Sequence, residues 1–112
     1  MGANVTTTGA QTYSGATTLS GGARNLSGTT VSFASTVAGG ANDLTVTGNA
    51  SVGGAVTNVG NLSVTGTSAL AANVTTTGAQ SYNGAVSLSG TAVNLSTASL
   101  TTNAALTAGS TN

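Results

Sequence analysis

The 112-residue sequence predicts an all-β parallel β-helix, a solenoid of about six coils with roughly 18 residues and three short strands in each coil. Three observations predict this fold class. Apolar and polar residues alternate, a small residue recurs every six positions, and a long block occurs twice. Alternation is the period of a β-strand, and regularly spaced glycines indicate that each strand is short and ends in a bend.

The alternation is clearest in the second half of the chain. The small residues that mark its bends are Gly48, Gly54, Gly60, Gly66, Ala72, Gly78, Gly84 and Gly90. Between them apolar residues occupy alternate, even-numbered positions, which we expect to face the interior: Val52, Val56, Leu62, Val64, Leu70, Val74, Tyr82, Val86 and Leu88. Threonine and valine dominate, and these β-branched residues favour extended backbone.

The long block covers residues 4–26 and recurs, at a 69-residue offset, as residues 73–95. Tyr13 falls on Tyr82 and Leu19 on Leu88. Internal repetition of this kind is typical of solenoids. We therefore expect residues 1–112 to form a single β-solenoid segment.

A shorter, 18-residue period relates Leu26, Leu44 and Leu62. If equivalent residues stack on successive coils, these three leucines form one interior column, with about 4.8 Å between neighbours. However, 69 is not a multiple of 18, so some coils must be shorter or longer.

The inward-facing parity also changes along the chain. It is odd for Val5, Tyr13, Leu19, Val31, Phe33 and Val37, but even for Leu26, Leu44 and Leu62. We expect corners or bulges at the changes, because one extra residue reverses the facing of a strand. Both tyrosines are thereby placed inside.

The same 18-residue spacing predicts a structural corner. Asn25, Asp43 and Asn61 should stack there, where their side chains can bind turn backbone. Arg24 should lie diagonally next to Asp43, one coil away. A salt bridge between them would be exposed and would contribute roughly 0 to 1 kcal/mol.

The composition excludes most chemistry. The chain has one basic residue (Arg24), one acidic residue (Asp43), and no His, Cys, Pro or Trp. Acid–base catalysis, activation of a Ser nucleophile and transition-metal binding all need groups that are missing. Nucleic-acid binding needs several cations, and no apolar run has the roughly 18 residues of a membrane helix. We expect no enzyme activity, cofactor, nucleic-acid partner or membrane insertion.

Outward hydroxyl groups suggest a binding surface. Two parallel ladders would be formed by Ser27, Thr29, Thr45, Thr47, Ser63 and Thr65. Regularly spaced threonines on a flat face resemble the ice-binding surfaces of some β-solenoids. The plainer interpretation is that threonine suits exposed strand positions.

A coil stack has two open ends, each a row of strand edges. Natural folds usually protect such edges with charge, proline or a covering element, and neither terminal region of the sequence carries a proline or a charge cluster. We expect either that the protein continues beyond these residues or that copies associate end to end.

The stretches NVTTTGAQTYSGATTLSG, GTTVSF and ANDLTVTGNASVGGAV resemble the repeats of filamentous-haemagglutinin-type and autotransporter-like bacterial surface adhesins. The resemblance covers nearly the whole chain. It implies a right-handed parallel β-helix that forms the shaft of a secreted adhesin, although the hexads also fit left-handed hexapeptide helices. No secretion domain or receptor-binding insertion is present, so the receptor stays unassigned.

The expected function is a non-catalytic structural rod segment of an extracellular bacterial adhesin, or of a self-assembling fibre, located outside the cell or at the bacterial cell surface. The alternative is an ice- or surface-binding solenoid that uses the Ser and Thr ladders.

Overall fold

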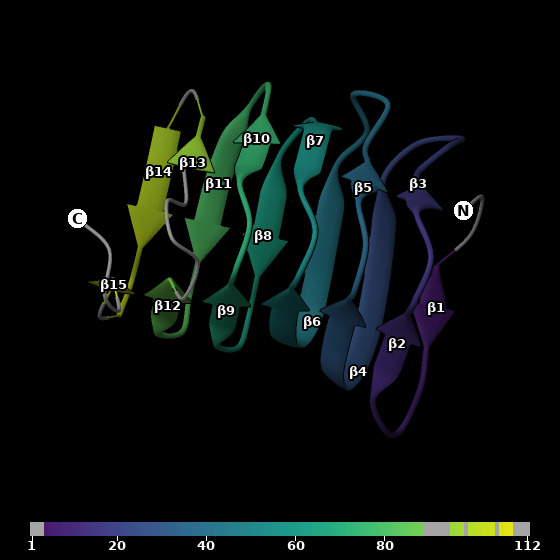
Figure 1. The fold of residues 1–112 in the computed structure, drawn as a ribbon, viewed down its shortest axis with the longest axis horizontal. Helices are drawn as coiled ribbons and strands as arrows, with labels where there is room; N and C mark the ends of the chain where they lie inside the picture. Colours follow the sequence, from purple (N-terminus) through teal and green to yellow (C-terminus); the bar gives the residue numbers. More distant parts are fainter. Residues whose placement is uncertain (1–3, 89–94, 98, 105, 109–112) are drawn as a thin grey trace.

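The computed structural model describes residues 4–88, 95–97, 99–104 and 106–108. These residues form fifteen strands and no helix. The strands run across a single axis and coil around it, with β1 and β15 at opposite ends of the stack (Figure 1). The predicted β-solenoid is confirmed, with about five coils in place of the expected six.

Each coil carries strand segments on three faces. Coil 1 contains β1 (Val5–Thr6), β2 (Gln11–Tyr13) and β3 (Thr17–Thr18). Coil 2 contains β4 (Arg24–Phe33) and β5 (Val37–Ala38), and coil 3 contains β6 (Leu44–Val52) and β7 (Val56–Val59). Coil 4 contains β8 (Leu62–Val64), β9 (Ser68–Leu70) and β10 (Val74–Thr76). Coil 5 contains β11 (Ala79–Tyr82), β12 (Val86–Leu88) and β13 (Leu95–Ser96), and β14 (Ser99–Thr102) and β15 (Leu106–Ala108) begin the next coil.

All strand pairs are parallel and join neighbouring coils. Face 1 is formed by β1, β8, β11, β14 and the first halves of β4 and β6. Face 2 is formed by β2, β9, β12, β15 and the second halves of the same two strands. Because β4 and β6 turn this corner without a break, the two faces form one ten-stranded sheet. Face 3 is a separate five-stranded sheet in the order β13-β10-β7-β5-β3.

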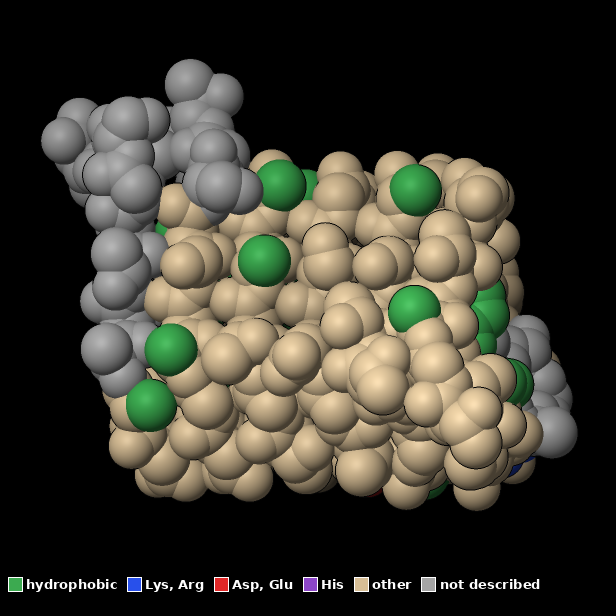
Figure 2. Space-filling view, turned by 90° about the horizontal axis from the view of Figure 1, so that it is seen from below, with side chains coloured by type: hydrophobic (Ala, Val, Ile, Leu, Met, Phe, Trp, Pro, Cys, Tyr) green, Lys and Arg blue, Asp and Glu red, His purple; other side chains and the backbone are tan. Residues whose placement is uncertain are grey.

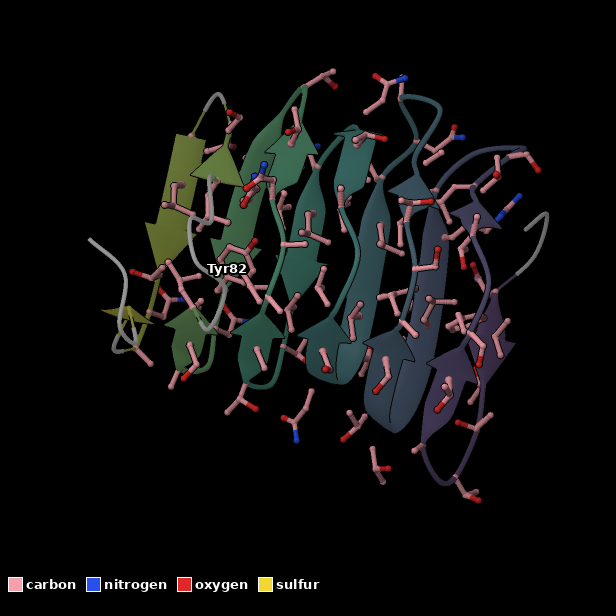
Figure 3. All side chains as sticks on the ribbon, viewed as in Figure 1. Tyr82 is labelled. Atoms are coloured by element: carbon pink, nitrogen blue, oxygen red, sulfur yellow. The ribbon has the colours of Figure 1, made fainter. Side chains whose placement is uncertain are left out.

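The interior is a narrow column of mainly aliphatic side chains (Figure 3). Its largest members include Phe33 and Tyr82, which are buried, and the half-buried Tyr13 packs against it. The alternation therefore placed both tyrosines on the correct side. Stability comes from this burial together with the backbone bonds between adjacent coils.

The predicted leucine column is wrong at Leu26. Leu44 lies opposite Leu62, as expected, but Leu26 lies opposite Val46, and Arg24 lies opposite Leu44. We call the number of residues between two positions that lie opposite each other on neighbouring coils the offset. It is 20 residues at Leu26 and 18 residues at Leu44. Because the two offsets differ by an even number, Leu26 still faces the interior.

A bulge accounts for part of the change in offset. The pairing of β4 with β6 shifts between Ser27, opposite Thr47, and Thr30, opposite Asn49. Gly48 is then the single residue that faces two on β4, at a φ of 129°. A Cβ atom on Gly48 would collide with the carbonyl oxygen of Gly28, in coil 2. The bulge therefore requires glycine at this position.

The two copies of the long block occupy different faces. Val5 begins its copy in β1, on face 1 of coil 1, whereas Val74 begins its copy in β10, on face 3 of coil 4. The 69-residue offset therefore spans three coils and two further faces. The structural unit that repeats is one strand with its corner, because the same sequence forms the same strands on either face.

Candidate functional site

Asn and Asp side chains at the corners bind the backbone of the next coil. The Asn61 N–H donates to Asp43 Oδ1 at 2.8 Å, and the Ala79 N–H donates to Asn61 Oδ1 at 2.8 Å. At another corner the Thr67 N–H donates to Asn49 Oδ1 at 2.9 Å. These oxygens satisfy backbone donors where the chain turns and tie each coil to its neighbour.

This close approach explains one of the regularly spaced glycines. Asn61 Oδ1 occupies the space that a Cβ atom on Gly78 would need. The residue that follows Gly78 is Ala79, whose N–H donates to the same oxygen. A side chain at position 78 would therefore displace Asn61 Oδ1 from its hydrogen bond, which favours glycine one coil after this corner asparagine.

The structure brings together two of the three residues predicted at one corner. Asp43 and Asn61 are joined, but Asn25 lies opposite Thr45, and its N–H donates to Asn4 Oδ1 at 2.9 Å. Asn25 therefore belongs to a different column, for the same reason as Leu26: coils 2 and 3 are related by a 20-residue offset at this point.

Arg24 lies diagonally beside Asp43, and the Arg24 N–H donates to the Asp43 carbonyl oxygen at 2.9 Å. Its guanidinium, however, donates to backbone carbonyls of its own corner. Nε and Nη2 reach the Ser20 oxygen at 3.1 and 2.7 Å, and Nη1 reaches the Ala23 oxygen at 2.9 Å. The cation thus braces a Gly-rich turn, and the Asp43 carboxylate binds the next coil.

The predicted hydroxyl ladder occupies face 1 in a different register. Thr45 lies opposite Ser63 as expected, but Ser27 lies opposite Thr47. Thr29 falls in the bulge of β4, where the pairing is interrupted, and does not continue either column. The column that contains Thr45 is longer than expected, because it extends from Asn25 through Ser63 to Ser81 and Thr101.

Several of these polar groups are already engaged within the molecule. Thr47 Oγ1 donates to Asn25 Oδ1 at 3.2 Å, and Thr65 Oγ1 accepts the Gly48 N–H at 2.9 Å. Thr45 and Ser63 are half-buried. The hydroxyl groups on this face thus support the corners as well as facing solvent.

A buried polar cluster inside the solenoid was missed by the sequence analysis. The Gln80 side chain is fully buried, and its Nε2 donates to the carbonyl oxygens of Val74 and Ser96, both at 3.2 Å. The Tyr82 hydroxyl donates to Gln80 Oε1 at 2.7 Å. Figure 3 shows Tyr82 within the interior. This Gln–Tyr cluster links coil 4 to coil 5 with its polar atoms satisfied.

The first copy of the long block repeats the cluster. Gln11 Nε2 donates to the oxygens of Val5 and Ser27, at 3.2 and 2.7 Å, and the Tyr13 hydroxyl donates to Gln11 Oε1 at 2.6 Å. Tyr13 also stacks on Phe33, with ring centroids 5.3 Å apart. The available signal was a glutamine at inward parity two residues before an inward tyrosine.

Two tyrosine phenols and one buried serine hydroxyl group lie along the interior of the solenoid. Burial raises the pKa of both tyrosine phenols, most strongly at Tyr82, which keeps them neutral hydrogen-bond donors. The Ser68 hydroxyl is buried without a partner, between Ala50 and Val86 of the adjacent coils. No group of three His, Cys, Asp or Glu residues occurs among these residues.

None of the described residues forms a helix that could span a membrane. No protein-family model, curated protein or solved structure matches this chain.

Proposed function

We propose that this chain is a non-catalytic structural rod segment of an extracellular bacterial surface adhesin or of a self-assembling fibre. The observation that carries the proposal is the unbroken stacking of the coils through parallel strand ladders. These strands lie across the long axis, so the hydrogen bonds between coils point along it. A load applied to the two ends is then shared by many backbone bonds at once, as a shaft requires.

The outer surface supports a spacer role. On the face shown in Figure 2, hydrophobic side chains are few and occur singly or in small groups among other side chains and backbone. The two charged residues serve corners: Arg24 binds turn carbonyls, and Asp43 binds the next coil. A small, neutral, hydroxyl-rich surface offers little to a nucleic acid or to an ionic substrate.

The proposal also places the chain outside the cell or at the bacterial cell surface. Support comes from the resemblance of NVTTTGAQTYSGATTLSG and related stretches to the repeats of secreted adhesins. The chain contains no cysteine, so its fold does not depend on the redox state of the compartment that holds it.

A binding assay tests the spacer role. The purified chain, immobilised on beads, would be incubated with host cells, a glycan array and crystalline polysaccharides. Binding would be measured, and the solution would be assayed for soluble hydrolysis products. We expect no saturable binding and no product. A Val46→Asp variant places a charge in the core and should unfold, so it separates fold-dependent binding from the stickiness of an exposed chain. Saturable binding that this variant loses would overturn the spacer role.

The second candidate is an ice- or surface-binding solenoid. It is favoured by one observation, the long hydroxyl-rich column through Thr45, Ser63, Ser81 and Thr101 on face 1. The test is thermal hysteresis at millimolar protein. A Thr45→Val variant should lower the hysteresis, whereas Thr57→Val, on face 3, should not. Absence of hysteresis in the unmodified chain would eliminate this candidate.

A further inference from the structure

The first and last coils each present strands that have a neighbour on one side only, within the part of the chain that the structure describes. At one end, β1 and β2 pair with β4, and β3 pairs with β5. At the other end, β13 pairs with β10, β14 pairs with β11, and β15 pairs with β12. We call these the N-terminal edge (β1, β2, β3) and the C-terminal edge (β13, β14, β15).

The internal repeat shows what the N-terminal edge can accept. Its strands correspond to β10, β11 and β12 at the 69-residue offset. Those three strands are paired on both sides, and on the side equivalent to the N-terminal edge they pair with β7, β8 and β9. Nearly the same sequence therefore already accepts parallel strands on this side, elsewhere in the same molecule.

The strands β14 and β15 of the C-terminal edge lie beyond the repeated block, but they pair with β11 and β12 as β4 and β5 pair with β2 and β3. At the same offset, residues 99–102 correspond to residues 30–33 of β4, and residues 106–107 correspond to β5. Both counterparts are followed by a further coil, since β4 pairs with β6 and β5 pairs with β7. At the C-terminal edge, by contrast, Leu100 of the interior column is 42 % exposed, and a further coil would cover it.

Among the described residues, neither edge carries a charged residue or a proline, two features that usually protect a strand edge. The two charged residues, Arg24 and Asp43, lie in coil 2 and in the corner before coil 3, and the sequence has no proline. The cross-section measures 28 × 25 Å, so an end-on contact would cover at most about 700 Å² on each partner, close to the roughly 800 Å² of a standard interface.

We propose that the C-terminal edge pairs in parallel with the N-terminal edge of a second copy of this chain, so that the solenoid continues across the junction. The contact joins two different surfaces, so it does not close on itself and would extend copies into a filament. The inference rests on the proposed structural role and deepens it by naming the partner and the edges.

Two variants block one edge each. Leu100→Lys places a charge on the exposed end of the interior column. Thr12→Pro removes a backbone donor from the N-terminal edge. The Ala34 N–H, in coil 2, donates to the Tyr13 carbonyl oxygen, in coil 1, at 2.9 Å. The backbone N–H of Thr12, the preceding residue, therefore points to the opposite, open side of the strand. The matched control, Thr57→Lys, adds the same charge to an exposed position in the middle of the rod.

Sedimentation velocity and electron microscopy would follow assembly between micromolar and millimolar protein, with circular dichroism to verify folding. We expect concentration-dependent oligomers or filaments from the unmodified chain and from Thr57→Lys, and monomers from each edge variant alone. An equal mixture of the two edge variants should form dimers and stop, because one intact edge of each kind remains.

A monomeric unmodified chain would overturn the proposal, and so would unchanged assembly of a folded Leu100→Lys variant. Either result is compatible with the spacer role, provided that the binding assay on beads detects no saturable binding. Saturable adhesion by the chain would instead contradict the spacer role while leaving the assembly result intact, so the two failures are distinguishable.

Discussion

Removal of one hydroxyl group from the Gln–Tyr cluster should destabilise the fold at Tyr82 more than at Tyr13. Tyr82→Phe leaves Gln80 Oε1 without its donor in a site from which water is excluded. An unsatisfied buried acceptor costs about 1–3 kcal/mol. Tyr13→Phe makes the same chemical change, but Tyr13 is half-buried, so water can replace the lost donor and we expect about 0.5–1 kcal/mol.

Urea unfolding followed by far-ultraviolet circular dichroism measures both losses. With a slope of about 2 kcal/mol per molar urea, a loss of 2 kcal/mol lowers the midpoint by about 1 M. The two slopes should agree with that of the unmodified chain, which verifies that the same unfolding is compared. The reasoning is refuted if Tyr82→Phe is as stable as the unmodified chain, or if Tyr13→Phe loses more.

Three further predictions concern single positions. Ser68→Ala removes a buried hydroxyl that has no partner, so the free energy of unfolding should rise by about 1 kcal/mol, and an unchanged urea midpoint would contradict this. Gly78→Ala places a methyl group where Asn61 Oδ1 lies, so it should lower the melting temperature, whereas Ala85→Gly at an exposed corner should change it little. Because burial raises the pKa of the Tyr82 phenol above its ordinary value of 10.0, the unfolded chain loses this proton first. Stability is then full below pH 10.0 and falls as the pH rises toward the folded pKa; urea midpoints between pH 8 and 11 should show less of this fall in Tyr82→Phe.

The facing of side chains within regular strands was predictable because it depends only on local alternation. Val59 is the exception: it lies at an odd position after Asn58, whose φ is 55°, and is fully buried. Val31 and Phe33 at odd positions and Leu44 and Leu62 at even positions are all buried. Coil length was not predictable in this way. Adjacent coils can be offset by 18 or by 20 residues without changing the side of the strand on which any side chain lies. The alternation around Leu26 is therefore the same whether Leu26 lies opposite Leu44 or opposite Val46. Pairing between distant segments decides between them.

The polar interior was missed because glutamine is usually an exposed residue. Gln80 is buried at no net loss, since two carbonyls and a phenol satisfy its amide. The sequence held a clue: Gln11 and Tyr13 share the inward parity of Val5, as Gln80 shares that of Tyr82. A polar residue on the apolar side of an alternation, preserved in both copies, indicates an internal hydrogen-bond partner.

The advance of the repeat by three coils and two faces governs how a longer chain would present itself to its surroundings. A side chain at one position of the repeat would point about a third of a turn away from its counterpart in the preceding copy. Three copies further along the chain, the equivalent side chain would again point in the original direction. Gold labels at Thr12 and at its counterpart Ser81 should therefore appear on different sides of the shaft, because β2 lies on face 2 and β11 on face 1. A shaft of this kind would offer its decorations in all directions, so a partner gripping two successive copies would have to wrap around it.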